Sequence, residues 1–127
     1  MLTLETQLSP GVDAGRQARA FVHDILHDAA LDHVNDVIEL LSTELVNNAV
    51  VHAAGSPTLR ITPGSSRIRV EVDDPSIDAP VLEVPDGRSE CGRGLLLVAS
   101  IADDWGFEVR SRGKTVWFEV SARGDDR

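Results

Sequence analysis

The sequence predicts an α+β fold, a two-layer sandwich in which helices cover one face of a mixed, mostly antiparallel sheet. Two observations predict it. Apolar residues recur at helical spacing in the first half of the chain and alternate at strand spacing in much of the second half. The alternating segments come in pairs joined by short turns, and such hairpins place neighbouring strands antiparallel. Helices with one apolar face are then expected to pack against a sheet with one apolar face.

The first half of the chain predicts one short strand and two helices. Alternation over residues 2–6 indicates the strand, and Ser9-Pro10-Gly11 ends it. A helix is expected over residues 14–29, because its apolar residues fall on one side. A second helix is expected from about residue 34 to residue 53, before the stop signal Gly55-Ser56-Pro57.

The second half predicts two hairpins that are separated by a long loop and a helix. These elements are expected, in chain order, at residues 59–72, 73–94, 93–102 and 105–120. The loop is rich in proline, glycine and acidic residues, and a loop of this length in a compact domain is often functional. Residues 1–122 are expected to form a single domain, with residues 123–127 as a flexible tail.

The composition narrows the class of function. The chain has a net charge of -9 and its 12 basic residues are scattered, so direct nucleic-acid binding is not expected. A single cysteine, Cys91, excludes an internal disulfide and suits a reducing compartment. The N-terminus lacks the features of a signal peptide, and no apolar run approaches the ~18 residues of a membrane span. We expect a cytoplasmic protein that does not contact a membrane.

Three polar residues of the second helix lie on one stripe. Successive residues turn by about 100°, so positions four apart drift by only about 40°, and Glu44, Asn48 and His52 lie side by side. The projection places this stripe within the apolar arc of the helix, with Asp36, Glu39, Thr43 and Asn47 facing solvent. Burying such groups without partners costs about 1–3 kcal/mol each, and more for a charge.

Two interpretations of the stripe remain open. It could be a satisfied buried network at the end of a helix, or it could line a ligand cavity. In a cavity, the Asn48 carbonyl oxygen suits a hard cation such as Mg²⁺, and Glu44 could deprotonate an attacking group.

Two further segments could contact a ligand that carries phosphates and an amine. Gly92-Arg93-Gly94 opens the third helix, where glycines let backbone N–H groups approach a phosphate and the helix dipole favours negative charge. Asp73 and Asp74 follow a strand, and a carboxylate there can accept a hydrogen bond from an exocyclic amine. Taken singly, the first segment is more often a hinge and the second more often a solvated turn.

In this order, the segments resemble the GHKL superfamily of nucleotide-binding domains, also called the Bergerat ATP-binding fold. Residues 42–53 resemble its N box, residues 70–76 its first glycine box, and residues 92–99 its second glycine box. Residues 113–119 resemble the closing strand of its anti-sigma factor kinase subgroup. The resemblance covers nearly the whole chain.

The resemblance implies ATP and Mg²⁺ as cofactors. Asn48 would hold Mg²⁺ against the phosphates and Glu44 would be the general base. The phosphates would also meet several backbone and side-chain groups. These are His52, Gly92, Arg93, Gly94 and Leu95. Residues 75–91 would form the ATP lid.

The resemblance also implies the contacts to adenine. Asp74 would read the amino group, and Thr115 would support the base through a water molecule. Pro75 and Ser76 stand where larger relatives have glycines, so Asp73 remains the alternative reader.

The implied function is that of an anti-sigma regulatory protein. It would sequester a sigma factor and act as a serine/threonine kinase on a STAS-domain antagonist, and the resemblance suggests a homodimer. Two alternatives remain: an ATP-binding module without turnover, and a protein-interaction module that binds no nucleotide.

Overall fold

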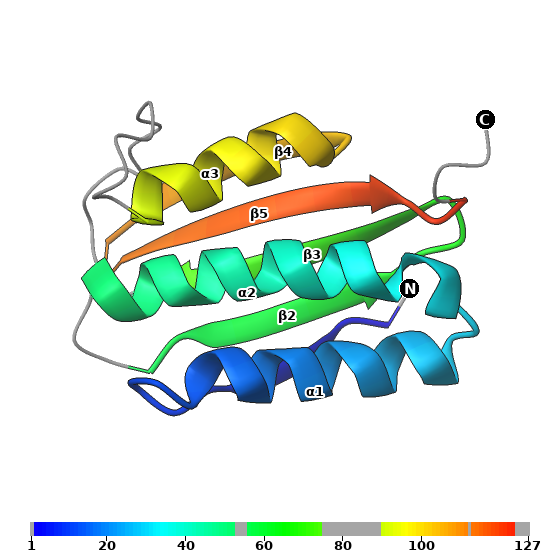
Figure 1. Ribbon diagram of the computed structural model, residues 1–127, viewed down its shortest axis with the longest axis horizontal. Coiled ribbons are helices and arrows are strands. Elements are labelled where there is room, and N and C mark those ends of the chain that lie inside the picture. The colour runs from blue at the N-terminus through cyan, green and yellow to red at the C-terminus, as the bar shows by residue number, and fades with distance from the viewer. Residues whose placement is uncertain (1, 53–55, 75–89, 112, 124–127) are drawn as a thin grey trace.

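The computed structural model describes residues 2–52, 56–74, 90–111 and 113–123. In these residues a five-stranded sheet is covered on one face by three helices (Figure 1). The elements follow in the order β1 (Leu4–Gln7), α1 (Ala14–Asp28), a 3₁₀ turn (Asp32–Val34), α2 (Asn35–His52), β2 (Thr58–Pro63), β3 (Arg67–Asp74), α3 (Glu90–Ile101), β4 (Asp104–Arg110) and β5 (Gly113–Ser121). The two-layer α+β fold is thus confirmed. We call the other face of the sheet, which none of these helices covers, the open face.

The sheet has the strand order β1-β2-β3-β5-β4. All four pairings among the described strands are antiparallel, whereas the sequence analysis expected a mixed sheet. The two expected hairpins are present as β2–β3 and β4–β5. β3 and β5 pair along eight positions in the middle of the sheet, so residues far apart in the sequence become direct neighbours there.

The core lies between the helices and the sheet. Alternate residues of β3 point toward the helices, so Ile68, Val70 and Val72 are fully buried, as is Phe118 of β5. The helices add apolar side chains from the faces turned toward the sheet, among them Val22 and Leu26 of α1 and Ile38 and Leu41 of α2. Each such side chain removes apolar area from water and contributes about 1.5–3 kcal/mol.

Two element boundaries differ from those expected. β3 continues through Asp74, so Asp73 and Asp74 belong to a strand and not to the loop. α3 begins at Glu90, so Gly92-Arg93-Gly94 lies inside the helix and does not precede it. Glycine is tolerated in a helix at a cost of about 1 kcal/mol, so it need not mark the boundary. The rest of the predicted lid, residues 75–89, and the tail from residue 124 lie outside the described residues.

Several predicted site segments meet at one end of the molecule. In Figure 1 the end of α2, the end of β3, the start of β5 and the start of α3 all lie at the left-hand end. This follows from the chain directions, because α2 and β3 run toward that end while α3 and β5 run away from it. Within the described residues, no helix is long and apolar enough to cross a membrane.

Candidate functional site

The polar stripe of α2 borders the buried face of the helix. Glu44 and Asn48 are half-buried, whereas the fully buried positions include Ile38, Leu41 and Val46. The projection had placed the stripe inside the apolar arc, and this detail is wrong. The buried arc is centred elsewhere because α2 packs against β3 beneath it and against α1 and α3 on its two sides.

The two sides of α2 have different neighbours. A Cβ added to Gly15 of α1 would lie 3.3 Å from Asn47 Oδ1 and 3.6 Å from Thr43 Cγ2, so this side of α2 faces α1. Thr43, expected to face solvent, is therefore half-buried. Glu44 lies on the opposite side, toward α3.

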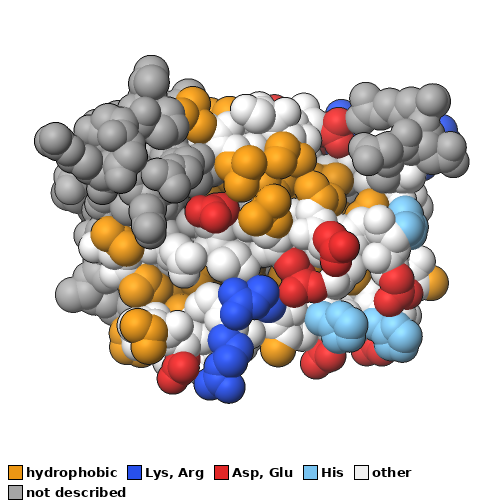
Figure 2. All heavy atoms as spheres, in the orientation of Figure 1, with side chains coloured by type: hydrophobic (Ala, Val, Ile, Leu, Met, Phe, Trp, Pro, Cys, Tyr) orange, Lys and Arg blue, Asp and Glu red, His pale blue; other side chains and the backbone are white. Residues whose placement is uncertain are grey.

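An open cavity of about 310 Å³ separates Glu44 from α3. Its other lining residues are Leu96, Leu97 and Ser100 of α3. Figure 2 shows apolar side chains gathered over this region between α2 and α3. A carboxylate beside an apolar, partly enclosed space can serve as a proton acceptor for a group that enters the space.

The remaining phosphate-side predictions are placed only through the backbone. His52 is the last residue of α2. The first two turns of α3 contain Gly92, Arg93, Gly94 and Leu95. The start of this helix lies at the end of the molecule where α2 and β3 also end. The first N–H groups of a helix have no partner within the helix and attract anions.

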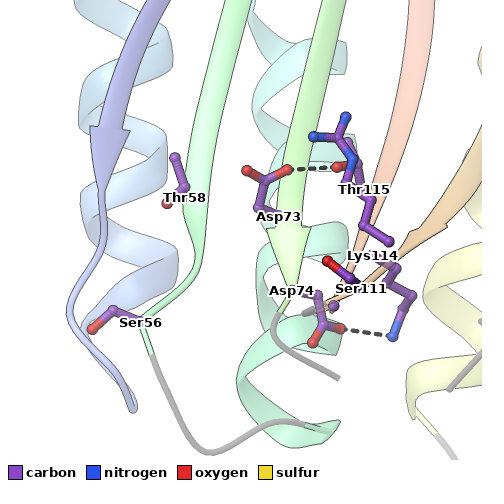
Figure 3. Close-up of a pocket in the computed structure, with 9 residues that line it drawn as sticks. Ser56, Thr58, Asp73, Asp74, Ser111, Lys114 and Thr115 are labelled. Carbon is purple, nitrogen blue, oxygen red and sulfur yellow. Dashed lines mark hydrogen bonds and ion pairs between the residues drawn. The ribbon is translucent and has the colours of Figure 1, made fainter. Parts of the chain in front are cut away.

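A second open pocket, of about 330 Å³, lies where β3 ends and β5 begins (Figure 3). Ser56 and Thr58 line one side, and Gly113 belongs to the wall on the β5 side. Asp73 and Asp74 reach this pocket from β3. Because neighbouring residues of a strand point to opposite faces, these two carboxylates have different surroundings.

Asp74 points to the helix-covered face and pairs with Lys114. The Lys114 Nζ atom lies 2.9 Å from Asp74 Oδ2, and the two side chains are only 6% and 5% exposed. The register brings them together, because Asp74 is the direct partner of Lys114 across β3 and β5. Figure 3 shows this ion pair at the end of the two strands.

Asp73 points to the open face and is held by two other groups. Arg60 donates two hydrogen bonds of 2.6 Å to its two carboxylate oxygens, and the Thr115 hydroxyl donates a third of 2.6 Å. Burial alone would raise the pKa of Asp73, but these hydrogen bonds outweigh it and the pKa lies below its ordinary value. The hydrogen bonds to Asp73 also raise the pKa of Arg60 above its ordinary value, against the opposing effect of burial.

The two predicted adenine contacts line the same pocket but face different sides of the sheet. Asp74 lies on the helix-covered face with α2, while Thr115 is on the open face with Asp73. In the structure the Thr115 hydroxyl donates its hydrogen bond to Asp73, and its support of a base read by Asp74 stays a prediction. The alternative reader, Asp73, is directed away from Glu44 and Asn48, so Asp74 is the carboxylate that can share a site with α2.

Lys114 is the residue that the sequence analysis missed. The signal was present, since Val116, Phe118 and Val120 alternate as inward-facing residues of β5. Continuing that alternation backwards places Lys114 inward and Thr115 outward. The same rule places Asp74 inward after Ile68, Val70 and Val72.

The residues present fit a magnesium nucleotide. Asn48 offers an amide oxygen, which is a ligand suited to Mg²⁺, and the start of α3 offers backbone donors suited to phosphate. Asp74, the last residue of β3, offers a carboxylate acceptor suited to an amine. These groups come from three elements, α2, α3 and β3, that converge at one end of the two-layer fold.

A comparison with protein families agrees with this geometry. The family described as histidine kinase-like ATPase domain matches residues 8–120. The matched span runs from the end of β1 to the last residues of β5, and so includes every residue of the candidate site. A search of the curated proteins finds no match to the chain.

Proposed function

The chain belongs to the histidine kinase-like ATPase domain family, and we propose that it binds ATP with Mg²⁺ between α2, the start of α3 and the β3–β5 end of the sheet. Asn48 holds the metal, the first turns of α3 meet the phosphates, and Asp74 accepts a hydrogen bond from the adenine amine. The bound metal neutralises phosphate charge and so favours phosphoryl transfer. The observation that carries the proposal is the convergence of Asn48, Asp74 and α3 at one end of the fold.

We further propose that the protein is an anti-sigma regulator in the cytoplasm. In this role it sequesters a sigma factor, acts as a homodimer, and phosphorylates a serine or threonine of a STAS-domain antagonist. The resemblance of residues 42–53 and 113–119 to the anti-sigma kinases supports this proposal. The cavity beside Glu44 supports it as well, because a general base requires space for the hydroxyl that it deprotonates.

Nucleotide binding is tested by calorimetric titration of the protein with ATP, with and without Mg²⁺. Binding is expected to be saturable and to depend on Mg²⁺, and Asn48→Ala is expected to abolish it. Asn47→Ala is the matched control, because Asn47 is the adjacent amide on α2 but is exposed on the side that faces α1. Equal binding of Mg-ATP by wild type and Asn48→Ala would show that Asn48 has no such role.

Kinase activity is tested separately with labelled ATP and a STAS-domain protein. Glu44→Gln is expected to keep ATP affinity within about twofold and to lower phosphotransfer at least about a hundredfold, because a general base contributes on that scale. Asp36→Asn, an exposed acid in the first turn of the same helix, should leave the rate unchanged. ATP binding without any transfer by wild type would favour the alternative of a binding module without turnover.

A further inference from the structure

We propose that Lys114 is a specificity-determining residue for the nucleobase, and that it donates a hydrogen bond to adenine N1 while Asp74 accepts one from the exocyclic amine. This inference rests on the proposed nucleotide site and adds a residue to it. The structure contributes three observations: the place of the pair in the sheet, its burial, and the chemistry of its two ends.

The pair occupies the last inward-facing position of the two central strands. The next inward-facing residue is Val72 in β3 and Val116 in β5, and these two valines also face each other across the strands. The sheet therefore changes from an apolar pair to an ionic pair at one step. That step falls on the wall of the pocket at the β3–β5 end.

Stability alone does not explain an ionic pair at this position. Removing two charges from water costs several kcal/mol per ion, and well-packed apolar side chains are often at least as stable in the same place. An apolar pair would simply continue the core formed by Val72 and Val116. A pair that lines a pocket, in contrast, presents charge to whatever enters the pocket.

The two ends of the pair match one edge of adenine. A carboxylate only accepts hydrogen bonds and an ammonium group only donates them, so the pair presents an acceptor beside a donor. Adenine carries an N6 amine, which donates, beside N1, which accepts. This edge lies opposite N9, where the ribose is attached, so it is the edge that reaches the far wall when the phosphates lie near α2 and α3. Guanine has the reverse order, with the O6 acceptor beside the N1 donor.

The test compares ATP with two analogues that each lack one ring nitrogen. Calorimetry would give the dissociation constants of ATP, 1-deaza-ATP and 7-deaza-ATP for wild type and for Lys114→Met. For wild type, loss of N1 should weaken binding about tenfold or more, because a hydrogen bond to a charged group contributes on that scale. Loss of N7 should have little effect. For Lys114→Met, ATP and 1-deaza-ATP should bind equally.

Other results would overturn the inference. Equal binding of ATP and 1-deaza-ATP by wild type, or an N1 dependence that persists in Lys114→Met, would mean that Lys114 does not contact N1. In either case the ATP site itself would stand, whereas failure of wild type to bind ATP at all would refute the proposed function.

Lys114→Met leaves the Asp74 carboxylate without this partner, so its folding should be checked by circular dichroism. If it is unfolded, the double variant Asp74→Asn/Lys114→Met removes both charges and keeps similar shapes. The same ratio of ATP to 1-deaza-ATP then decides the question. A ratio near one supports the inference, and the wild-type ratio contradicts it.

Discussion

Asp73 and Asp74 show how one step along a strand changes the role of a side chain. Both are carboxylates at the same end of β3, yet one contacts Arg60 and Thr115 on the open face and the other contacts Lys114 on the helix-covered face. The difference follows from strand geometry alone. We therefore expect substitutions at these two positions to affect different properties.

Asp73→Asn should lower stability and leave ATP affinity unchanged. The substitution weakens the two bonds from Arg60 and the bond from Thr115, so a loss of about 1–2 kcal/mol in the free energy of unfolding is expected. Urea denaturation and calorimetry measure the two quantities. Asp74→Asn is the paired variant, and it should reduce ATP affinity. A loss of affinity in Asp73→Asn would contradict the assignment of Asp74 as the base reader.

The Asp73 contribution should also depend on pH in a defined direction. The pKa of Asp73 is lower in the folded state than in the unfolded chain, so the folded state binds fewer protons in acid. Its stabilising effect is complete above the ordinary carboxyl pKa of about 4 and is lost as the pH falls through the lowered folded value. The stability difference between wild type and Asp73→Asn should therefore shrink on acidification below about pH 4. A difference that grows in acid would contradict the pKa direction.

At the scale of elements, the β4–β5 hairpin depends on a close contact on the open face. Trp117 lies against Gly106 of the paired strand, and a Cβ at Gly106 would come 2.9 Å from the Trp117 ring. The Arg69 guanidinium also lies over that ring, 4.1 Å from its centroid. The indole thus contacts both a glycine and a cation.

Gly106→Ala should destabilise the protein by about 1–3 kcal/mol, because overpacking forces the ring away from its position. Urea denaturation measures the loss, and tryptophan fluorescence should change in the folded state. Glu108→Ala is the control, since Glu108 is exposed on the same strand and its truncation should change stability by less than about 0.5 kcal/mol. Equal stabilities of the two variants would mean that Trp117 does not restrict Gly106.

The sequence predicted the type and order of the elements because hydrophobic period is a local property. Residues 14–29 and 59–72 show this, since their helical and alternating periods survive in α1 and in the β2–β3 hairpin. Boundaries were less predictable. Gly92 was expected to precede a helix, although glycine is only mildly unfavourable inside one. The side of the sheet that Thr115 faces was predictable in principle, because the alternation along β5 assigns this residue to the open face.

For the whole molecule, the contacts that build the site join distant parts of the chain. The Thr115 hydroxyl bonds to Asp73 across 42 residues of sequence, and no local pattern indicates which residue of β5 faces which residue of β3. The register sets these partners, and the turns and core packing of the complete sheet set the register. This is why the sequence identified Asp74 as a candidate but not its pairing with Lys114.

The ion pairs on the open face also depend on the complete fold, because the sheet brings their residues together. Arg60 and Arg69 each bridge to Glu71, and Arg67 and Arg69 both bind Glu119, so charged residues of β2, β3 and β5 neutralise one another. Hydrogen bonds from Arg69 and Arg67 lower the pKa of Glu119, although burial opposes this shift. None of the described helices covers this face, which instead carries this network of ion pairs.

The proposed Mg-ATP site lies at the end of the fold where α2, α3, β3 and β5 meet. The most direct test is a nuclear magnetic resonance titration of the ¹⁵N-labelled protein with Mg-ATP, with the backbone amides assigned. Saturable changes in amide chemical shift are predicted at Asn48, Asp74 and Lys114 and in the first turns of α3. The amide resonances at the start of α1 should not shift. Shifts confined to α1 and β1, or none at saturating nucleotide, would contradict the assignment of the site.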